Sequence, residues 1–184
     1  MKRIIIVLML STLVLAAVSA QQAVSSQAAA EISFNYVRQT GSASNQFAVW
    51  VEDNNGNPVK TLFVTRWTAN GGFRRRPSTI PVWVKQSGVA GLSKAQVDAM
   101  SGATPRAGTL TYTWDGTDSA GKAVSPGNYF IILEGTLRWE NQVLYRAPIT
   151  LGQRAAPVEI RGQYTGDLTD ERSMISNVRV QVLR

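Results

Sequence analysis

The stretch FAVWVEDNNGNPVKTLFVTRW, residues 47–67, decides the fold class. Phe47, Val49 and Val51 recur at every second position, as expected for a β-strand with one apolar face. The turn that follows, DNNGNP at 53–58, is rich in residues that tolerate positive φ or preset a turn. The chain then returns in residues 59–67. This stretch therefore predicts an antiparallel hairpin.

Short strands of the same kind are predicted along the rest of the chain. They are separated by glycine and proline and lie at 32–37, 109–114, 128–134, 141–150, 158–164 and 177–183. About seven antiparallel strands favour an all-β fold, an immunoglobulin-like antiparallel β-sandwich. The chain has no cysteine, so apolar packing must hold this sandwich together without disulfides.

A long insertion, residues 68–108, interrupts the strand pattern. Connections beyond roughly 12 to 15 residues are uncommon in compact domains and are usually functional. Within it, SKAQVDAM at 93–100 predicts a short helix with Ser93 as its N-cap and Gly102 as its end. We therefore predict a partly helical insertion in which Thr104 lies just past the helix.

The first twenty residues predict export. Lys2 and Arg3 precede an apolar run at 4–18, and VSA ends at Ala20 with small residues at a signal-peptidase site. The run is shorter than the roughly 20 residues needed to cross a bilayer, so we expect a cleaved signal peptide rather than a membrane anchor. We predict a periplasmic protein without stable membrane insertion, with a signal peptide at 1–20, a disordered leader at 21–30 and one sandwich domain at 31–184.

The composition excludes several classes of function. With neither histidine nor cysteine, soft metal sites and histidine acid–base catalysis are unavailable, so we expect no metal site and no catalytic residue. A hydrolase or transferase is the weakest alternative. Without Lys2 and Arg3, 17 basic residues face 12 acidic ones, an excess that favours anionic ligands or acidic partners. No nucleic-acid motif is present, and we expect no nucleic-acid partner.

Three segments carry resemblances to known families. YTWDGTDSAGKAVSPGNYFIILEG, residues 112–135, resembles the immunoglobulin-like module at the C-terminus of the flagellar hook-capping protein, which supports the fold prediction. Together with RRPSTIPVW at 75–83 and VDAMSGAT at 97–104, the first part of this segment resembles a bacterial family of predicted periplasmic proteins, a domain of unknown function. That resemblance implies gene neighbours that encode flavin transferases and membrane redox proteins.

A third resemblance concerns Thr104. The pattern Asp98-x-x-Ser101-Gly102-Ala103-Thr104 resembles the acceptor motif Asp-x-x-(Ser/Thr)-Gly-Ala-(Thr/Ser) of proteins that carry covalent FMN, such as the FMN-binding subunits of sodium-pumping quinone reductases. It implies that a flavin transferase cleaves FAD and joins the FMN phosphate to the hydroxyl of Thr104. Asp98, Ser101, Gly102 and Ala103 would be recognition positions. A helix-terminating turn would also explain SGATP.

The chemistry of such an attachment asks little of the acceptor, because the transferase supplies metal and base. Candidate phosphate contacts are Arg76 and Arg106, with Arg74 and Arg75, and candidate stacking partners of the flavin are Trp83, Phe73 and Trp67. The leading hypothesis is an exported FMN-carrying electron-transfer protein, with a membrane redox protein as electron donor or acceptor. The alternative is a structural, or protein- or polysaccharide-binding, module without a cofactor.

Overall fold

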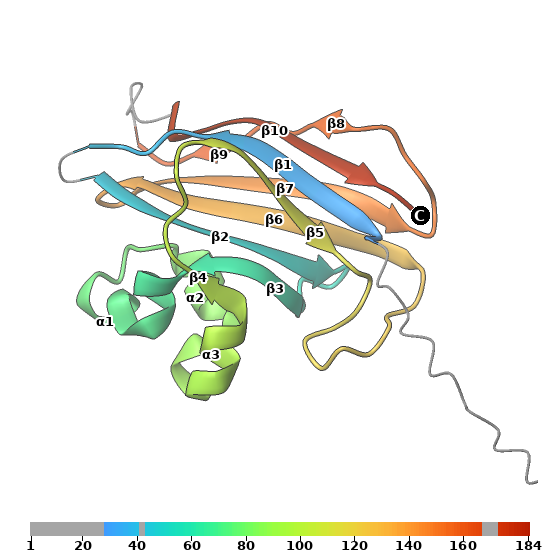
Figure 1. Ribbon diagram of the computed structural model, residues 1–184, viewed down its shortest axis with the longest axis horizontal. Helices are drawn as coiled ribbons and strands as arrows, with labels where there is room; N and C mark the ends of the chain where they lie inside the picture. Colours follow the sequence, from blue (N-terminus) through green and yellow to red (C-terminus); the bar gives the residue numbers. More distant parts are fainter. Residues whose placement is uncertain (1–27, 41–42, 167–172) are drawn as a thin grey trace, which may run out of the picture.

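The protein is described by a computed structural model that covers residues 28–40, 43–166 and 173–184. Two β-sheets pack face to face, and helices cover the outer side of the larger sheet (Figure 1). The predicted signal peptide and most of the predicted leader lie outside the described residues. The last two leader residues belong to the fold, because Ala29 and Ala30 are buried and strand β1 begins at Ala30.

The larger sheet has six strands and the smaller sheet has four. The smaller sheet runs in the order β5 (Gly108–Trp114), β1 (Ala30–Tyr36), β10 (Ile175–Val182) and β8 (Val158–Glu159). The larger runs β4 (Ser101–Gly102), β3 (Pro58–Thr65), β2 (Ala43–Asp53), β6 (Gly127–Arg138), β7 (Asn141–Leu151) and β9 (Gln163–Tyr164). The predicted all-β sandwich and the hairpin of β2 and β3 are confirmed.

The long strands follow the immunoglobulin order in a permuted form. With β1 as strand B, the strands β2, β3, β5, β6 and β7 take the places of C, C′, E, F and G. Strand β10 lies antiparallel beside β1, in the place of strand A. The two sheets then contain E-B-A and C′-C-F-G. The C-terminus therefore supplies the strand that comes first in the usual immunoglobulin domain.

The predicted strand at 158–164 is instead two short strands in different sheets. Strand β8 pairs with β10 in the smaller sheet, whereas β9 pairs with β7 in the larger one. The link between β8 and β9 passes close to β7. A Cβ on Gly162, in this link, would lie 2.7 Å from Val143 and 2.8 Å from Tyr145. Glycine allows this approach, and the segment changes sheet where an unbroken strand was predicted.

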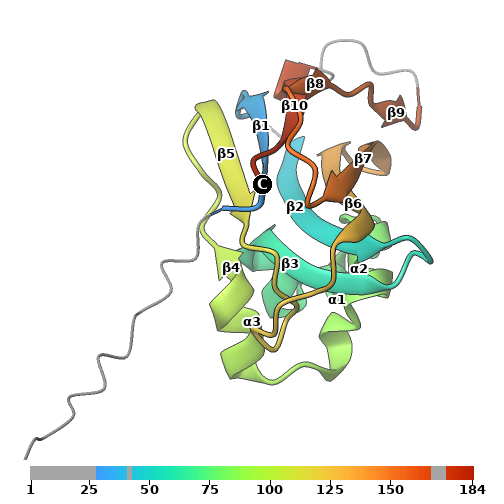
Figure 2. The same ribbon diagram turned by 90° about the vertical axis from the view of Figure 1, so that its right-hand side faces the viewer.

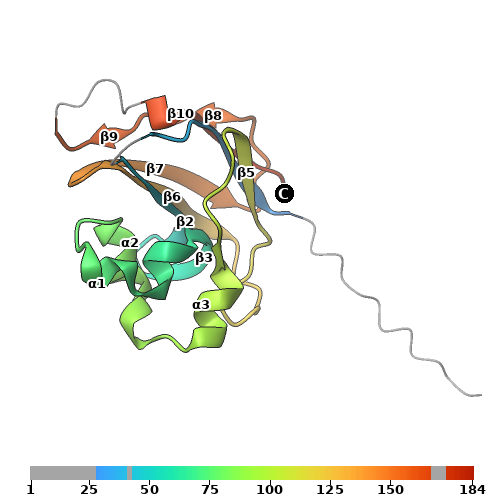
Figure 3. The ribbon, with the colours of Figure 1, turned by 60° about the vertical axis from the view of Figure 1, so that its left-hand side comes forward.

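Two apolar cores lie on either side of the larger sheet. The inner core fills the space between the sheets and includes Phe47, Val49 and Trp114. The outer core includes Trp50 of β2 and Trp83 of the insertion. The helices of the insertion lie against the larger sheet on this side (Figure 3). Strand β2 therefore buries both faces, although its sequence predicted only one apolar face. The insertion covers the second face.

The insertion is partly helical, as predicted. It contains η1 (Thr68–Gly72), α1 (Phe73–Arg75), α2 (Pro81–Ser87), η2 (Val89–Gly91) and α3 (Lys94–Met100). The predicted cap is confirmed, since the Ser93 hydroxyl accepts a hydrogen bond from the Gln96 N–H and the Gln96 side chain accepts one from the Ser93 N–H. Gly102 does not end this helix. The helix ends at Met100, and Gly102 lies in β4.

Strand β6 holds the insertion in place through polar side chains. Figure 2 shows α1, α2 and α3 on the side of β2 and β3 that faces away from β1 and β10. At the start of α2, the Val82 and Trp83 N–H groups donate to the carboxylate of Glu134 at 3.0 and 2.7 Å, and the Ile80 N–H donates to the Thr136 hydroxyl at 2.8 Å. Glu134 is 1% exposed, and this burial raises its pKa to about 7.

Candidate functional site

Thr104 is brought beside the end of β3 by the one parallel strand pair among the described residues. Val64 pairs with Ser101, and Thr65 pairs with Gly102. In a parallel pair the two chains leave in the same direction, so Ala103 and Thr104 run alongside Arg66 and Trp67. This pairing joins two segments that are nearly forty residues apart in the sequence.

The two segments form an open groove of about 710 Å³. We call it the arginine groove, and its lining residues are Arg66, Trp67, Asn70, Gly71, Gly72, Arg74, Arg75, Ala103 and Thr104. Thr104 is half-buried, and its hydroxyl makes no hydrogen bond with the described residues. The hydroxyl oxygen is not among the buried side-chain oxygens without a partner, so it is accessible from the surface, and Thr104 lines the groove.

The remaining positions of the acceptor motif lie at the end of α3 and in β4. Asp98 is exposed and forms an ion pair with Lys94 one turn earlier. Ser101 is half-buried, and its hydroxyl oxygen is buried without a hydrogen-bond partner in the described structure. Gly102 lies against the ring of Phe63, where a Cβ would come within 2.6 Å. Ala103 is exposed and lines the groove.

Trp83 cannot be the stacking partner that the sequence predicted. It is 0% exposed in the outer core, and its indole N–H donates to the Thr61 hydroxyl at 3.1 Å. Trp67 lines the groove instead and is 42% exposed. Its neighbour Gly72 is needed for this placement, because a Cβ there would lie 2.5 Å from the indole ring. Sequence proximity alone could not separate the two tryptophans.

Some of the predicted arginines line the groove and others do not. Arg74 and Arg75 line the groove, together with Arg66, which the sequence analysis missed. Arg76 does not line it, and its guanidinium lies 5.8 Å from the Trp67 ring and 5.5 Å from the Trp139 ring. Arg106 is exposed and does not line the groove.

The electrostatics of the groove are strongly positive. No carboxylate in the described part of the chain pairs with Arg66, Arg74 or Arg75. Residues 54–97 contain seven lysines and arginines and no aspartate or glutamate. This run without acidic residues was visible in the sequence and would have indicated Arg66. Three unpaired guanidinium groups around one hollow favour an anion with several acceptor oxygens.

Comparisons with known proteins identify the family. A family model described as a predicted periplasmic protein, DUF2271, matches residues 27–167. The chain belongs to this family. The match includes both the acceptor motif and the whole arginine groove, and it confirms the periplasmic location expected from the sequence. Searches of curated proteins and of solved structures found no match. The expected link of this DUF2271 protein to flavin stays a prediction.

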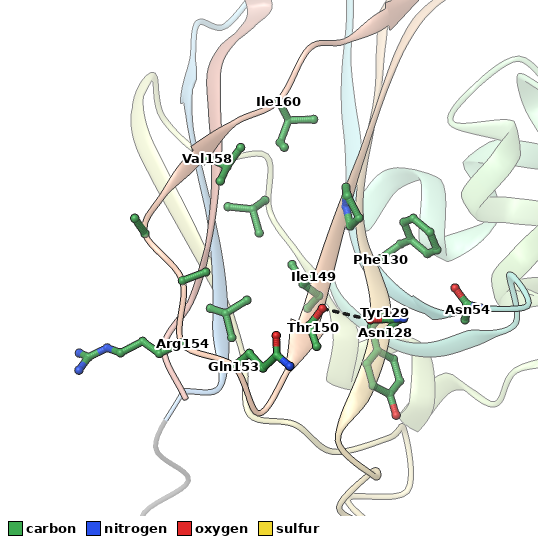
Figure 4. Close-up of a pocket in the computed structure, with 15 residues that line it drawn as sticks. Asn54, Asn128, Tyr129, Phe130, Ile149, Thr150, Gln153, Arg154, Val158 and Ile160 are labelled. Atoms are coloured by element: carbon green, nitrogen blue, oxygen red, sulfur yellow. Dashed lines mark hydrogen bonds between the residues drawn. The ribbon is translucent and has the colours of Figure 1, made fainter.

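A second hollow of the DUF2271 protein, about 620 Å³, lies between β7 and the segment that contains β8 (Figure 4). Its lining is mainly apolar and amide side chains, and Arg154 extends away from the others. Pro148, on β7, has no N–H, which is typical of a protected edge strand. The two hollows share no lining residue, and Arg154 is the one charged side chain in the lining of this hollow, against three arginines in the arginine groove.

Two further observations concern metals and membranes. Within the described residues, no three histidine, cysteine, aspartate or glutamate side chains gather where they could hold a metal ion. The described residues of the DUF2271 protein likewise contain no helix with the length and apolar character of a membrane span.

Proposed function

We propose that this protein is an exported FMN-carrying electron-transfer protein in which FMN is joined to Thr104 by a flavin transferase. FMN supplies one- or two-electron transfer when bound. The chain needs no catalytic residue of its own for this role. It presents the hydroxyl, holds the attached group and offers a surface to a membrane redox protein.

The attachment is a phosphoryl transfer from FAD. The Thr104 hydroxyl oxygen attacks the phosphorus on the riboflavin side of the FAD diphosphate, forming an oxygen–phosphorus bond. The bond between the two phosphates breaks, AMP leaves, and the hydroxyl proton passes to a base of the transferase. The transferase also supplies the metal ion that such transfers use. The acceptor chain therefore contributes only an accessible oxygen.

The observation that carries the proposal is the position of Thr104 at the rim of the arginine groove. The groove volume, about 710 Å³, falls within the usual range for ligand pockets, roughly 300 to 1,000 Å³. Arg66, Arg74 and Arg75 suit a phosphodiester, which keeps a negative charge after attachment. The exposed indole of Trp67 suits a planar ring. The residues present therefore fit FMN.

The direct test is covalent labelling. The full chain is expressed with a flavin transferase in an exporting host, and the purified product is examined by in-gel fluorescence and intact mass. We expect a fluorescent band and a mass increase of one FMN less one water. Thr104→Ala should abolish both signals, and Thr104→Ser should keep them because the serine hydroxyl can form the same ester.

The matched control is Thr109→Ala. Thr109 is an exposed threonine five positions later, and its hydroxyl donates to Asn35 at 3.0 Å. This variant should be labelled like the wild type. A wild-type product of unmodified mass, or labelling that persists in Thr104→Ala, would contradict the proposal. An unmodified product would favour the alternative of a structural or binding module without a cofactor.

A further inference from the structure

We infer that the arginine groove is a preformed site that binds phosphorylated flavin without a covalent bond. The inference takes the identity of the ligand from the proposed function, but the binding does not depend on the Thr104 hydroxyl. Arg66, Arg74 and Arg75 bind the phosphate, and Trp67 stacks on the ring system. The site therefore recognises a phosphate monoester linked to a planar aromatic group.

The three arginines of the groove have no carboxylate counter-ions in the described part of the chain. Guanidinium groups on a protein surface usually lie near carboxylates. They come from both ends of one short turn, because Arg66 precedes η1 and Arg74 and Arg75 follow it. The turn thus holds three like charges around one hollow. A bound phosphate relieves this repulsion and accepts several hydrogen bonds.

The indole of Trp67 is the aromatic group of the groove. Its ring packs directly on Gly72, and this contact restricts the positions open to the indole. The Arg76 guanidinium lies 5.8 Å from the ring centre and restricts it further. The indole nevertheless stays 42% exposed within the groove lining. A half-exposed aromatic ring is a suitable platform for a second planar ring.

These contacts predict an order of affinities. FMN engages both the arginines and the indole, riboflavin lacks the phosphate, and inorganic phosphate lacks the ring. We expect FMN to bind at least tenfold tighter than either of the other two, and its affinity to fall as salt is added.

The experiment uses the full mature chain with Thr104→Ala, which cannot form the ester. FMN, riboflavin and inorganic phosphate are titrated by calorimetry, and FMN also by flavin fluorescence. Introducing Arg66→Gln or Arg75→Gln into the same background should weaken FMN binding about tenfold or more without changing riboflavin binding. Trp67→Leu should weaken FMN and riboflavin by a similar factor, and circular dichroism checks that each variant is folded.

The matched control is Arg154→Gln, which removes one arginine at the other hollow. Its affinity for FMN should stay within about twofold of the parent. Equal affinity for FMN and riboflavin, or no binding of FMN, would overturn the inference even if the wild type is labelled covalently. Selective FMN binding would support it even if covalent labelling fails, so the two failures are distinguishable.

Discussion

The carboxylate of Glu134 should make the stability of this protein depend on pH between about 4.5 and about 7. Its pKa in the folded protein is raised to about 7 from an ordinary value of 4.5, because the group is buried beneath α2. Between these values the folded protein binds more protons than the unfolded chain. The free energy of unfolding therefore falls as the pH rises, and it levels off above about 7.

The size of the effect follows from the two pKa values. Their separation corresponds to about 3 kcal/mol, with a steepest slope of about 1.4 kcal/mol per pH unit. The assay is urea unfolding, followed by tryptophan fluorescence at several values from about pH 5 to about pH 8. The buried Trp83 donates its backbone N–H to Glu134, so its emission reports on this region.

Glu134→Gln removes the titration and should abolish this slope. The Val82 and Trp83 N–H groups donate to different carboxylate oxygens, and in the amide one of these two positions is an NH2 group that cannot accept. One buried N–H then lacks a partner, at a cost of about 1–3 kcal/mol. The variant should be less stable than the wild type near pH 5 and about equally stable near pH 8.

Glu159→Gln is the control for loss of a negative charge, because Glu159 is exposed on β8. It should keep the wild-type slope. The pKa of Asp53 is lowered by a hydrogen bond from the Asn57 side chain, so its contribution to stability is lost only at more acidic pH. A flat wild-type profile, or an unchanged slope in Glu134→Gln, would refute the reasoning.

Three further variants test the packing around the site and the fold. Gly102→Ala places a Cβ 2.6 Å from Phe63 and should lower the free energy of unfolding in urea by about 1–2 kcal/mol. Adding Phe63→Leu should largely restore this stability. A single variant as stable as the wild type would contradict the contact. Ser93→Ala removes the N-cap of α3, so it should lower the free energy of unfolding by about 1 kcal/mol and speed amide hydrogen exchange in that helix. Unchanged exchange would argue against the capping box. Gly162→Ala should lower the free energy of unfolding by about 1–3 kcal/mol, because its Cβ would press on the buried side chains of Val143 and Tyr145. Gly91→Ala has open space at its Cβ and should leave the stability unchanged. Equal effects of the two variants would refute the close contact between Gly162 and β7.

Local signals in the sequence predicted the parts of the fold that depend on near neighbours. The period of two and the DNNGNP turn predicted the β2–β3 hairpin, and Ser93 with its helical spacing predicted α3. The division of 158–164 between two sheets could not be predicted, because it depends on how Gly162 passes over β7. The position of β10 beside β1 likewise joins the two ends of the domain, and no local pattern encodes that pairing.

In the candidate site, too, local sequence patterns predicted some residues, whereas others depended on tertiary packing. The resemblance of residues 98–104 to the acceptor motif singled out Thr104. The run at 54–97, which has no acidic residue, includes Arg66, Arg74 and Arg75. The choice between Trp67 and Trp83 depended on tertiary packing, because an aromatic residue in an insertion suits a core or a surface equally well. The pairing of β3 with β4 decides which residues lie near Thr104, and it involves two residues on each side.

That short parallel pair links the stability of the insertion to the properties of the site. Helix α2 is held on β6 by Glu134, α3 begins at its own cap, and β4 then joins β3. Each contact fixes one part of the path from Trp67 to Thr104. Displacing β4 would move Thr104 away from Arg66 and Trp67. Variants such as Gly102→Ala should therefore weaken the flavin binding proposed above, since the groove is lined from both the β3 and the β4 side only while these strands remain paired.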